Sequence, residues 1–195
     1  MATAYVFTST QMRVDPATPV KEWRLSDEGR ARVLRVVGAP WVSRVRRIVT
    51  STEYAVIEAA NMFARRLDLA VEFRQELDDS HRPSSAFLSV AEFDRMLDAF
   101  FGRPEEGPLP GWEGAADAQK RVIAAVDTVI ETDQDEPGDL LFILHGRIAS
   151  LLLCHLAGLP ISREFFQPMF GGNLFAFDRA SRRVLFRWRR VAPPL

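Results

Sequence analysis

The chain has 195 residues, and this length predicts a single domain. Its 47% hydrophobic and 26% charged residues are ordinary globular values, which exclude a disordered or low-complexity protein. The 25 Lys and Arg residues against 26 Asp and Glu residues give a formal net charge of −1, so no overall field attracts nucleic acid or an anionic membrane.

Strands and helices are predicted to alternate along the chain. Continuous apolar or β-branched runs predict strands at Tyr5–Thr8, Arg47–Thr50, Val71–Phe73 and Asp139–Leu144. Apolar residues at helical spacing predict helices over residues 26–38, 52–67, 91–101, 115–132 and 148–156. The runs Asn173–Phe177 and Val184–Trp188, joined by a polar turn, predict an antiparallel pair.

This order of elements predicts an α/β fold, with a mostly parallel sheet covered by helices on both faces and an antiparallel edge. In such sheets, ligands bind beyond the carboxyl ends of the strands. Three segments are therefore candidates for a binding site: Thr8–Thr10, Thr50–Thr52 and His145-Gly146.

Several other classes of site are not expected. Cys154 is the only cysteine, which excludes a disulfide framework, and it lies with His155 in an apolar helix, where both are expected in the core. The three histidines are too scattered for a metal motif, and no cofactor is expected. The longest apolar runs are far shorter than the ~20 residues of a membrane span. The N-terminus does not resemble a signal peptide, so a cytoplasmic location is expected.

Four blocks together resemble the histidine phosphatase superfamily, also called phosphoglycerate mutase-like. They are Trp23–Arg30, Ile48–Glu53 leading into Ile57–Ala60, Trp112–Gln119 before a long helix, and Asp139–Gly146. The resemblance runs from about Tyr5 to Trp188. It implies a three-layer α/β/α domain over residues 1–195, with residues 78–114 as a loop and helix insertion over the pocket.

The resemblance also implies roles for particular positions. In that family, a histidine after the first strand attacks phosphorus, a second histidine and arginines hold the phosphoryl oxygens, and an Asp or Glu protonates the leaving oxygen. Here Ser9 stands where the nucleophilic histidine belongs, and Ala55 stands near where a basic residue is expected. The second histidine is matched by His145, and the proton donor is best matched by Asp79.

The remaining candidates would line an anion pocket. They are Thr8 and Thr10 beside Ser9, Gly146 at a helix start, and the loop residues His81 and Arg82, which could return positive charge to the pocket. Ser9 could act as a nucleophile only with a base such as His145 within ~3 Å, and the sequence shows no acid to orient that histidine. The alternative for each residue is a purely structural or solvated role.

Three functions stay open from the sequence. The first is a histidine phosphatase-like protein that is inactive or very weak and binds a phosphoester or another anion. The second is an active phosphomonoester hydrolase rebuilt around Ser9, His145, Asp79 and His81. The third is a protein-interaction module. The expected partner is a phosphorylated small molecule or a free anion, with neither nucleic acid nor membrane, and the oligomeric state is open.

Overall fold

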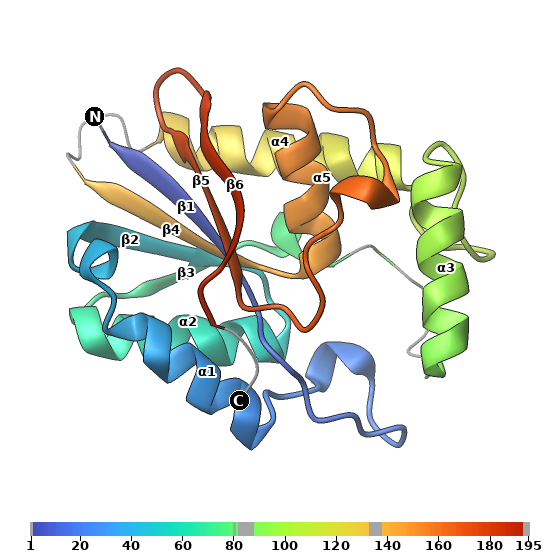
Figure 1. The fold of residues 1–195 in the computed structure, drawn as a ribbon, viewed down its shortest axis with the longest axis horizontal. Coiled ribbons are helices and arrows are strands. Elements are labelled where there is room, and N and C mark those ends of the chain that lie inside the picture. The colour runs from blue at the N-terminus through green and yellow to red at the C-terminus, as the bar shows by residue number, and fades with distance from the viewer. Residues whose placement is uncertain (1, 80, 82–87, 133–137, 193–195) are drawn as a thin grey trace.

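A six-stranded sheet forms the centre of the protein in the computed structural model, which describes residues 2–79, 81, 88–132 and 138–192 (Figure 1). The strand order is β3-β2-β4-β1-β5-β6. Strands β1 to β4 run parallel, whereas β5 is antiparallel to β1 and β6 is antiparallel to β5. The bounds are β1 Thr3–Thr8, β2 Val45–Thr50, β3 Val71–Phe73, β4 Asp139–Leu144, β5 Asn173–Asp178 and β6 Val184–Arg190.

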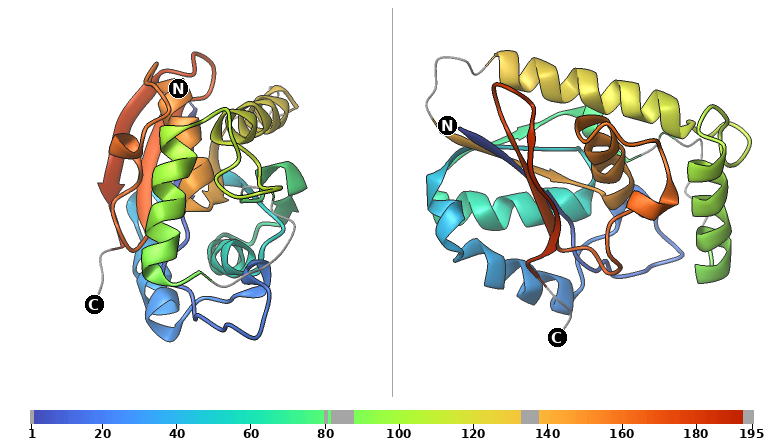
Figure 2. Two further views of the ribbon diagram at one scale, coloured as in Figure 1. Left: turned by 90° about the vertical axis from the view of Figure 1, so that its right-hand side faces the viewer. Right: turned by 45° about the horizontal axis from the view of Figure 1, so that its top comes forward.

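Helices cover both faces of the sheet, as Figures 1 and 2 show. Helices α1 (Asp27–Val37) and α2 (Tyr54–Leu67) lie below the sheet, and α4 (Ala115–Glu131) and α5 (Gly146–Leu156) lie above it. Helix α3 (Val90–Gly102) stands at one side. The three-layer α/β architecture is therefore confirmed.

The alternation of side chains along β1 explains why two separate cores form. Ala4 and Val6 pack into the core under α3, α4 and α5, whereas Tyr5 and Phe7 pack into the core against α1 and α2. Successive side chains of a strand point to opposite faces, so a strand buried on both faces must be apolar throughout. All six residues of β1 are buried.

Most helix limits follow the signals in the sequence. Ser26 caps α1 by accepting a hydrogen bond from the backbone of Gly29, and Ser89 forms a capping box with Glu92 at α3. Four short 3-10 helices were not predicted, at Val20–Glu22, Pro40–Arg44, Gln75–Leu77 and Arg163–Phe165. None of the described helices is long and apolar enough to cross a membrane.

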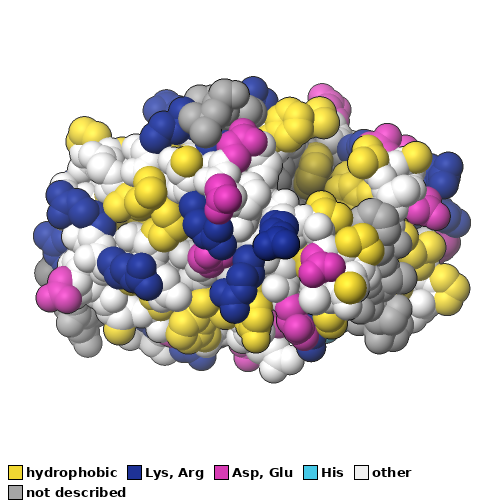
Figure 3. All heavy atoms as spheres, turned by 90° about the horizontal axis from the view of Figure 1, so that it is seen from below, with side chains coloured by type: hydrophobic (Ala, Val, Ile, Leu, Met, Phe, Trp, Pro, Cys, Tyr) yellow, Lys and Arg dark blue, Asp and Glu magenta, His cyan; other side chains and the backbone are white. Residues whose placement is uncertain are grey.

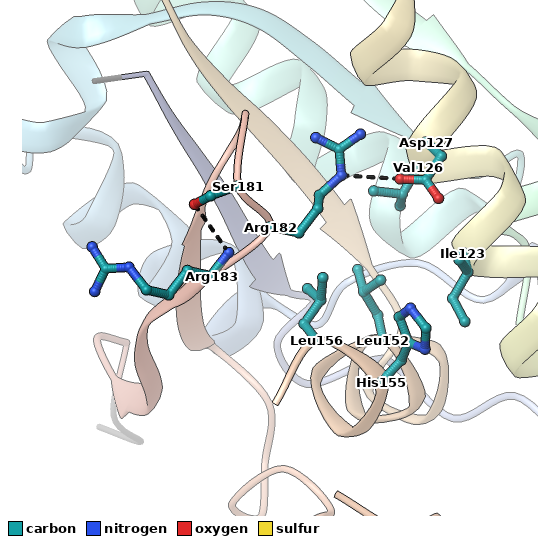
Figure 4. Close-up of a pocket in the computed structure, with 9 residues that line it drawn as sticks. All are labelled: Ile123, Val126, Asp127, Leu152, His155, Leu156, Ser181, Arg182 and Arg183. Carbon is teal, nitrogen blue, oxygen red and sulfur yellow. Dashed lines mark hydrogen bonds and ion pairs between the residues drawn. The ribbon is translucent and has the colours of Figure 1, made fainter. Parts of the chain in front are cut away.

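The expectation that His155 lies in the core is wrong. Cys154 is buried as predicted, but His155 is exposed on the outer side of α5. It lines a cavity of about 290 Å³ between α4, α5 and the β5–β6 turn, where Figure 4 shows its ring near Leu152 and Ile123. An apolar stretch of helix still has an outward face, and His155 lies on it.

Candidate functional site

The carboxyl ends of β1, β4 and β2 bring the predicted segments together. Thr8 pairs with Leu144 in the parallel ladder, and the backbone N–H of Ser9 donates to the carbonyl of Leu144 at 3.1 Å. Ser9 and His145 therefore follow neighbouring strands at the same edge. On the other side of β4, the Thr50 hydroxyl donates to the carbonyl of Ile143 at 2.7 Å.

Ser9 is held by its backbone and leaves its hydroxyl unused. Its residue is 8% exposed, and the hydroxyl makes no hydrogen bond within the described part of the chain. Its carbonyl accepts from the N–H of Gly172 at 3.2 Å. A Cβ on Gly171 would lie 1.9 Å from that carbonyl oxygen, so only glycine allows this approach.

The neighbouring threonines use their hydroxyls within the fold. The Thr8 hydroxyl accepts from the backbone N–H of Asn173 at 3.1 Å, and the Thr10 hydroxyl donates to the carbonyl of Gly29 at 2.8 Å. Both residues are buried. These contacts join β1 to β5 and to α1, and they occupy the hydroxyls that we expected to line an anion pocket.

His145 contacts a carboxylate that the sequence analysis missed. Its Nε2 lies 2.9 Å from Oε2 of Glu53, and both side chains are 12% exposed. The contact is an ion pair without the alignment of a good hydrogen bond. Burial lowers the pKa of His145, but the negative charge of Glu53 outweighs it, and the net pKa is raised. Burial likewise raises the pKa of Glu53, and the charge of His145 reverses this to a net lowering.

Asp79 is engaged by a second cation, Arg147. The guanidinium Nε of Arg147 donates to Oδ1 of Asp79 at 3.2 Å, and a second nitrogen contacts Oδ2. The Arg147 side chain is 4% exposed and lies over the ring of Phe100 in α3. The backbone N–H of Asp79 donates to Oε2 of Glu53 at 2.8 Å, which links the two ion pairs.

Asp78 adds a third carboxylate to the same edge. Its Oδ1 accepts from the backbone N–H of Thr52 at 2.6 Å and from the Thr52 hydroxyl at 2.9 Å. Burial raises the pKa of Asp78, and the charge of Glu53 adds to this rise. Among the described residues, the site therefore holds three carboxylates, Glu53, Asp78 and Asp79, against two cations, His145 and Arg147.

Of the two loop cations proposed from the sequence, the described one, His81, does not join this group. His81 is exposed, and only its backbone is anchored, through the carboxylate and the N–H of Glu113. Arg82 lies outside the described residues. Gly146 does lie at the site, where a Cβ would come within 1.8 Å of Nε2 of Gln167. Within the described residues, no group of three or more His, Cys, Asp or Glu side chains could hold a metal ion.

Glu53 and Arg147 were missed, although Arg147 carries a sequence signal. Glu53 precedes α2 but does not cap it with its side chain. Arg147 stands in the first turn of α5, where the helix dipole disfavours a cation. A buried cation at that end of a helix requires a carboxylate partner, and Asp79 is that partner.

Comparison with known proteins identifies the family to which this chain belongs. The family model described as "Histidine phosphatase superfamily (branch 1)" matches residues 10–184, a range that begins directly after Ser9. No curated protein matches the chain.

Solved structures of two similar proteins share the fold. YhfR of Bacillus stearothermophilus has a TM-score of 0.79 and 18% identity, with 97% of each chain covered. A mycobacterial glucosyl-3-phosphoglycerate phosphatase has a TM-score of 0.75 and 19% identity, with 97% of this chain and 96% of that chain covered. A further structure of the mycobacterial enzyme holds inorganic phosphate, with a TM-score of 0.75, 19% identity, and 97% and 95% covered. At these identities, the likeness extends to the fold alone.

Proposed function

Since the chain belongs to the histidine phosphatase superfamily, we propose that it is a member that does not hydrolyse phosphomonoesters and that keeps at most a weak affinity for phosphoesters or other anions. The observation that carries this proposal is that both described cations of the site are paired with carboxylates. His145 contacts Glu53, and Arg147 contacts Asp79.

Phosphoryl transfer needs positive charge around the phosphoryl oxygens. A phosphate dianion at this edge would meet Glu53, Asp78 and Asp79, and it would have to compete with them for His145 and Arg147. Each like-charge pair at 4 Å costs about 4 kcal/mol at an effective dielectric constant of ~20. The site therefore disfavours the substrate class that related phosphatases accept.

The chemistry of the site leads to the same conclusion. Ser9 stands in the position of the nucleophilic histidine, and a neutral serine hydroxyl is a far weaker nucleophile than imidazole. Asp79, the candidate proton donor, is engaged by Arg147. Removal of a nucleophile lowers kcat by several powers of ten, about 10⁴ to 10⁶ in a well-studied hydrolase.

The first test is the hydrolysis of p-nitrophenyl phosphate by the full chain beside an intact family member. We expect a kcat/KM lower by at least ~10³. Turnover comparable to that of the intact member would overturn the proposal. If that turnover disappeared in His145→Ala, it would establish the alternative, an active phosphomonoester hydrolase with a rearranged site.

The second test measures anion binding by the thermal shift with phosphate and vanadate, because a ligand of the native state raises Tm. We expect little or no shift for the natural chain and a larger shift for Glu53→Gln, which removes one repelling carboxylate. The matched control is Asp117→Asn, which changes a surface carboxylate that is paired with Lys120. A large shift for the natural chain would contradict the weak affinity. No shift in any variant would favour the protein-interaction module.

A further inference from the structure

The order of the strands places an acid, a base and a hydroxyl side by side. Glu53 follows β2, His145 follows β4 and Ser9 follows β1, and the sheet order β2-β4-β1 sets His145 between the other two. His145 meets Glu53 through Nε2 at 2.9 Å, so Nδ1 is the ring nitrogen that remains to act on Ser9. A carboxylate, an imidazole and a hydroxyl in this order are the parts of a serine hydrolase.

From this juxtaposition we propose that Ser9, His145 and Glu53 form a nucleophile, base and orienting carboxylate that hydrolyse a neutral carboxylic ester. The inference goes beyond the proposed function, since an ester bond to carbon needs no cluster of cations. Absence of phosphatase activity and presence of esterase activity are compatible in one protein.

The state of the Ser9 hydroxyl fits this role. It makes no hydrogen bond within the described part of the chain, unlike the hydroxyls of Thr8 and Thr10, which are bonded to the backbone. A hydrogen bond that stabilises the fold within the described residues therefore does not explain the Ser9 hydroxyl. Hydrogen bonds between a nucleophile and its base are often long without substrate and tighten when substrate binds.

The first turn of α5 supplies donors for the oxyanion. The first backbone bond of this turn runs from the N–H of Ala149 to the carbonyl of His145, so the amides of residues 146–148 precede the helical ladder. They lie directly after His145, at the edge that holds Ser9. Amides at a helix N-terminus stabilise the oxyanion of a tetrahedral intermediate.

Charge and exposed side chains define the substrate. The described side chains of the site, three carboxylates against two cations, repel an anionic ester and favour a neutral one. Met169 and Phe170 are 70% and 55% exposed. In the sequence they stand between Gln167, whose side chain lies next to Gly146, and Gly171, which packs on the carbonyl of Ser9. Figure 3 shows that hydrophobic side chains are also exposed in several places on the face seen from below, between charged ones. These features fit an ester with an apolar acyl group.

The reaction balances with groups on this chain and water. Ser9 Oγ bonds to the carbonyl carbon as its proton passes to Nδ1 of His145, and the carbon–oxygen bond to the alcohol then breaks as that oxygen takes the proton. Water next attacks the acyl-serine, gives a proton to His145 and releases the carboxylic acid. The proton returns from His145 to Ser9 Oγ.

The experiment treats the full chain with a fluorophosphonate probe and with p-nitrophenyl butyrate. We expect one covalent adduct, located on Ser9 by peptide mass spectrometry, and ester turnover that Ser9→Ala abolishes. Ser9→Ala removes a hydroxyl without hydrogen bonds, so it tests the proposal in a folded protein. Ser43→Ala, which changes an exposed serine away from the site, should keep the full rate. His145→Ala should lower both reactions by ~10³ or more.

Glu53 is a positioning residue, and its test is the pH profile. The charges of Glu53, Asp79 and Arg147 all act on His145, and Glu53 raises its pKa most. Because the base must be neutral, kcat/KM should rise with pH through that raised pKa, and Glu53→Gln should move the rise to lower pH. A purely structural role would leave the profile in place.

Three results would overturn the inference: turnover that persists in Ser9→Ala, a probe adduct on another residue, or no ester turnover at all. Failure of the proposed function would be seen separately, as hydrolysis of p-nitrophenyl phosphate.

Discussion

The two ends of the central sheet both carry ion pairs, but in different surroundings. At the carboxyl end, the site cluster of Glu53, His145, Asp79 and Arg147 has side chains that are 4% to 15% exposed. Towards the start of β4, an arginine cluster pairs Arg47 and Arg74 with Glu72, and Arg44 with Asp139, beside a cavity of about 430 Å³. There the arginine side chains are 23% to 64% exposed.

Ion pairs with similar contact distances therefore contribute differently to the free energy of unfolding at the two ends of the sheet. Water and salt screen the arginine cluster, so each of its pairs contributes little to the free energy of unfolding. The site cluster is mostly buried, and the loss of one charge from a buried ion pair is costly. We infer from this comparison that His145 and Arg147 stabilise the fold through their ion pairs with Glu53 and Asp79. They are therefore poorly available to bind a phosphate.

The largest effect is expected when the buried cation is removed. Arg147→Met should lower the free energy of unfolding by ~3–5 kcal/mol, because the nearly buried Asp79 then loses this ion pair. Urea denaturation at pH 7 measures this loss.

The double variant Arg147→Met with Asp79→Asn is the matched control. It should be more stable than the single variant, because neither charge remains. If the single variant lost less than ~1 kcal/mol, the site cluster would behave like an exposed pair and the contrast between the two ends would fail.

A smaller effect is expected from Glu53→Gln, and it depends on pH. At pH 6 the loss should be ~1.5–3 kcal/mol, the range for a contact to a charged group. The raised pKa of His145 means that its contribution is present below its unfolded pKa and is lost as pH rises through the folded value. The lowered pKa of Glu53 means that its contribution is lost as pH falls through that value.

The Glu53–His145 pair therefore stabilises the fold between those two pKa values, and the cost of Glu53→Gln should shrink as pH rises above this window. Urea denaturation from pH 6 to pH 9 measures the trend, with Asp117→Asn as the surface control. A difference between Glu53→Gln and the natural chain that did not change with pH would show that His145 does not change its protonation state in this range, and it would contradict the predicted window.

Local patterns were sufficient to predict the framework of the fold. Val71–Phe73 and Asp139–Leu144 are strands at the predicted limits, because β-branched and apolar runs identify strands without reference to the rest of the chain. The adjacency of Ser9 and His145 also follows, since the carboxyl ends of neighbouring parallel strands share one edge.

The partners within the site could not be predicted in this way. Glu53 and His145 are 92 positions apart in sequence, and the direction of each side chain depends on how α2 and α5 pack on the sheet. The same holds for Thr8 and Thr10, whose hydroxyls turn towards β5 and α1. Spacing identifies which residues reach an edge, but their pairing is decided by tertiary contacts.

The smallest effect is expected at the arginine cluster. Arg74→Gln removes one of two cations from Glu72, and Arg47 still donates to that carboxylate at 3.0 Å. The loss in free energy of unfolding should stay below ~1 kcal/mol, and it should fall further in 0.5 M NaCl because the pair is exposed to screening. Arg147→Met measured in the same salt should keep most of its loss, since few ions reach a buried pair. If salt reduced the loss of both variants equally, the ion pairs at the two ends of the sheet would be equally exposed to solvent. If Arg74→Gln lost as much free energy of unfolding as Arg147→Met, both pairs would behave as buried ones.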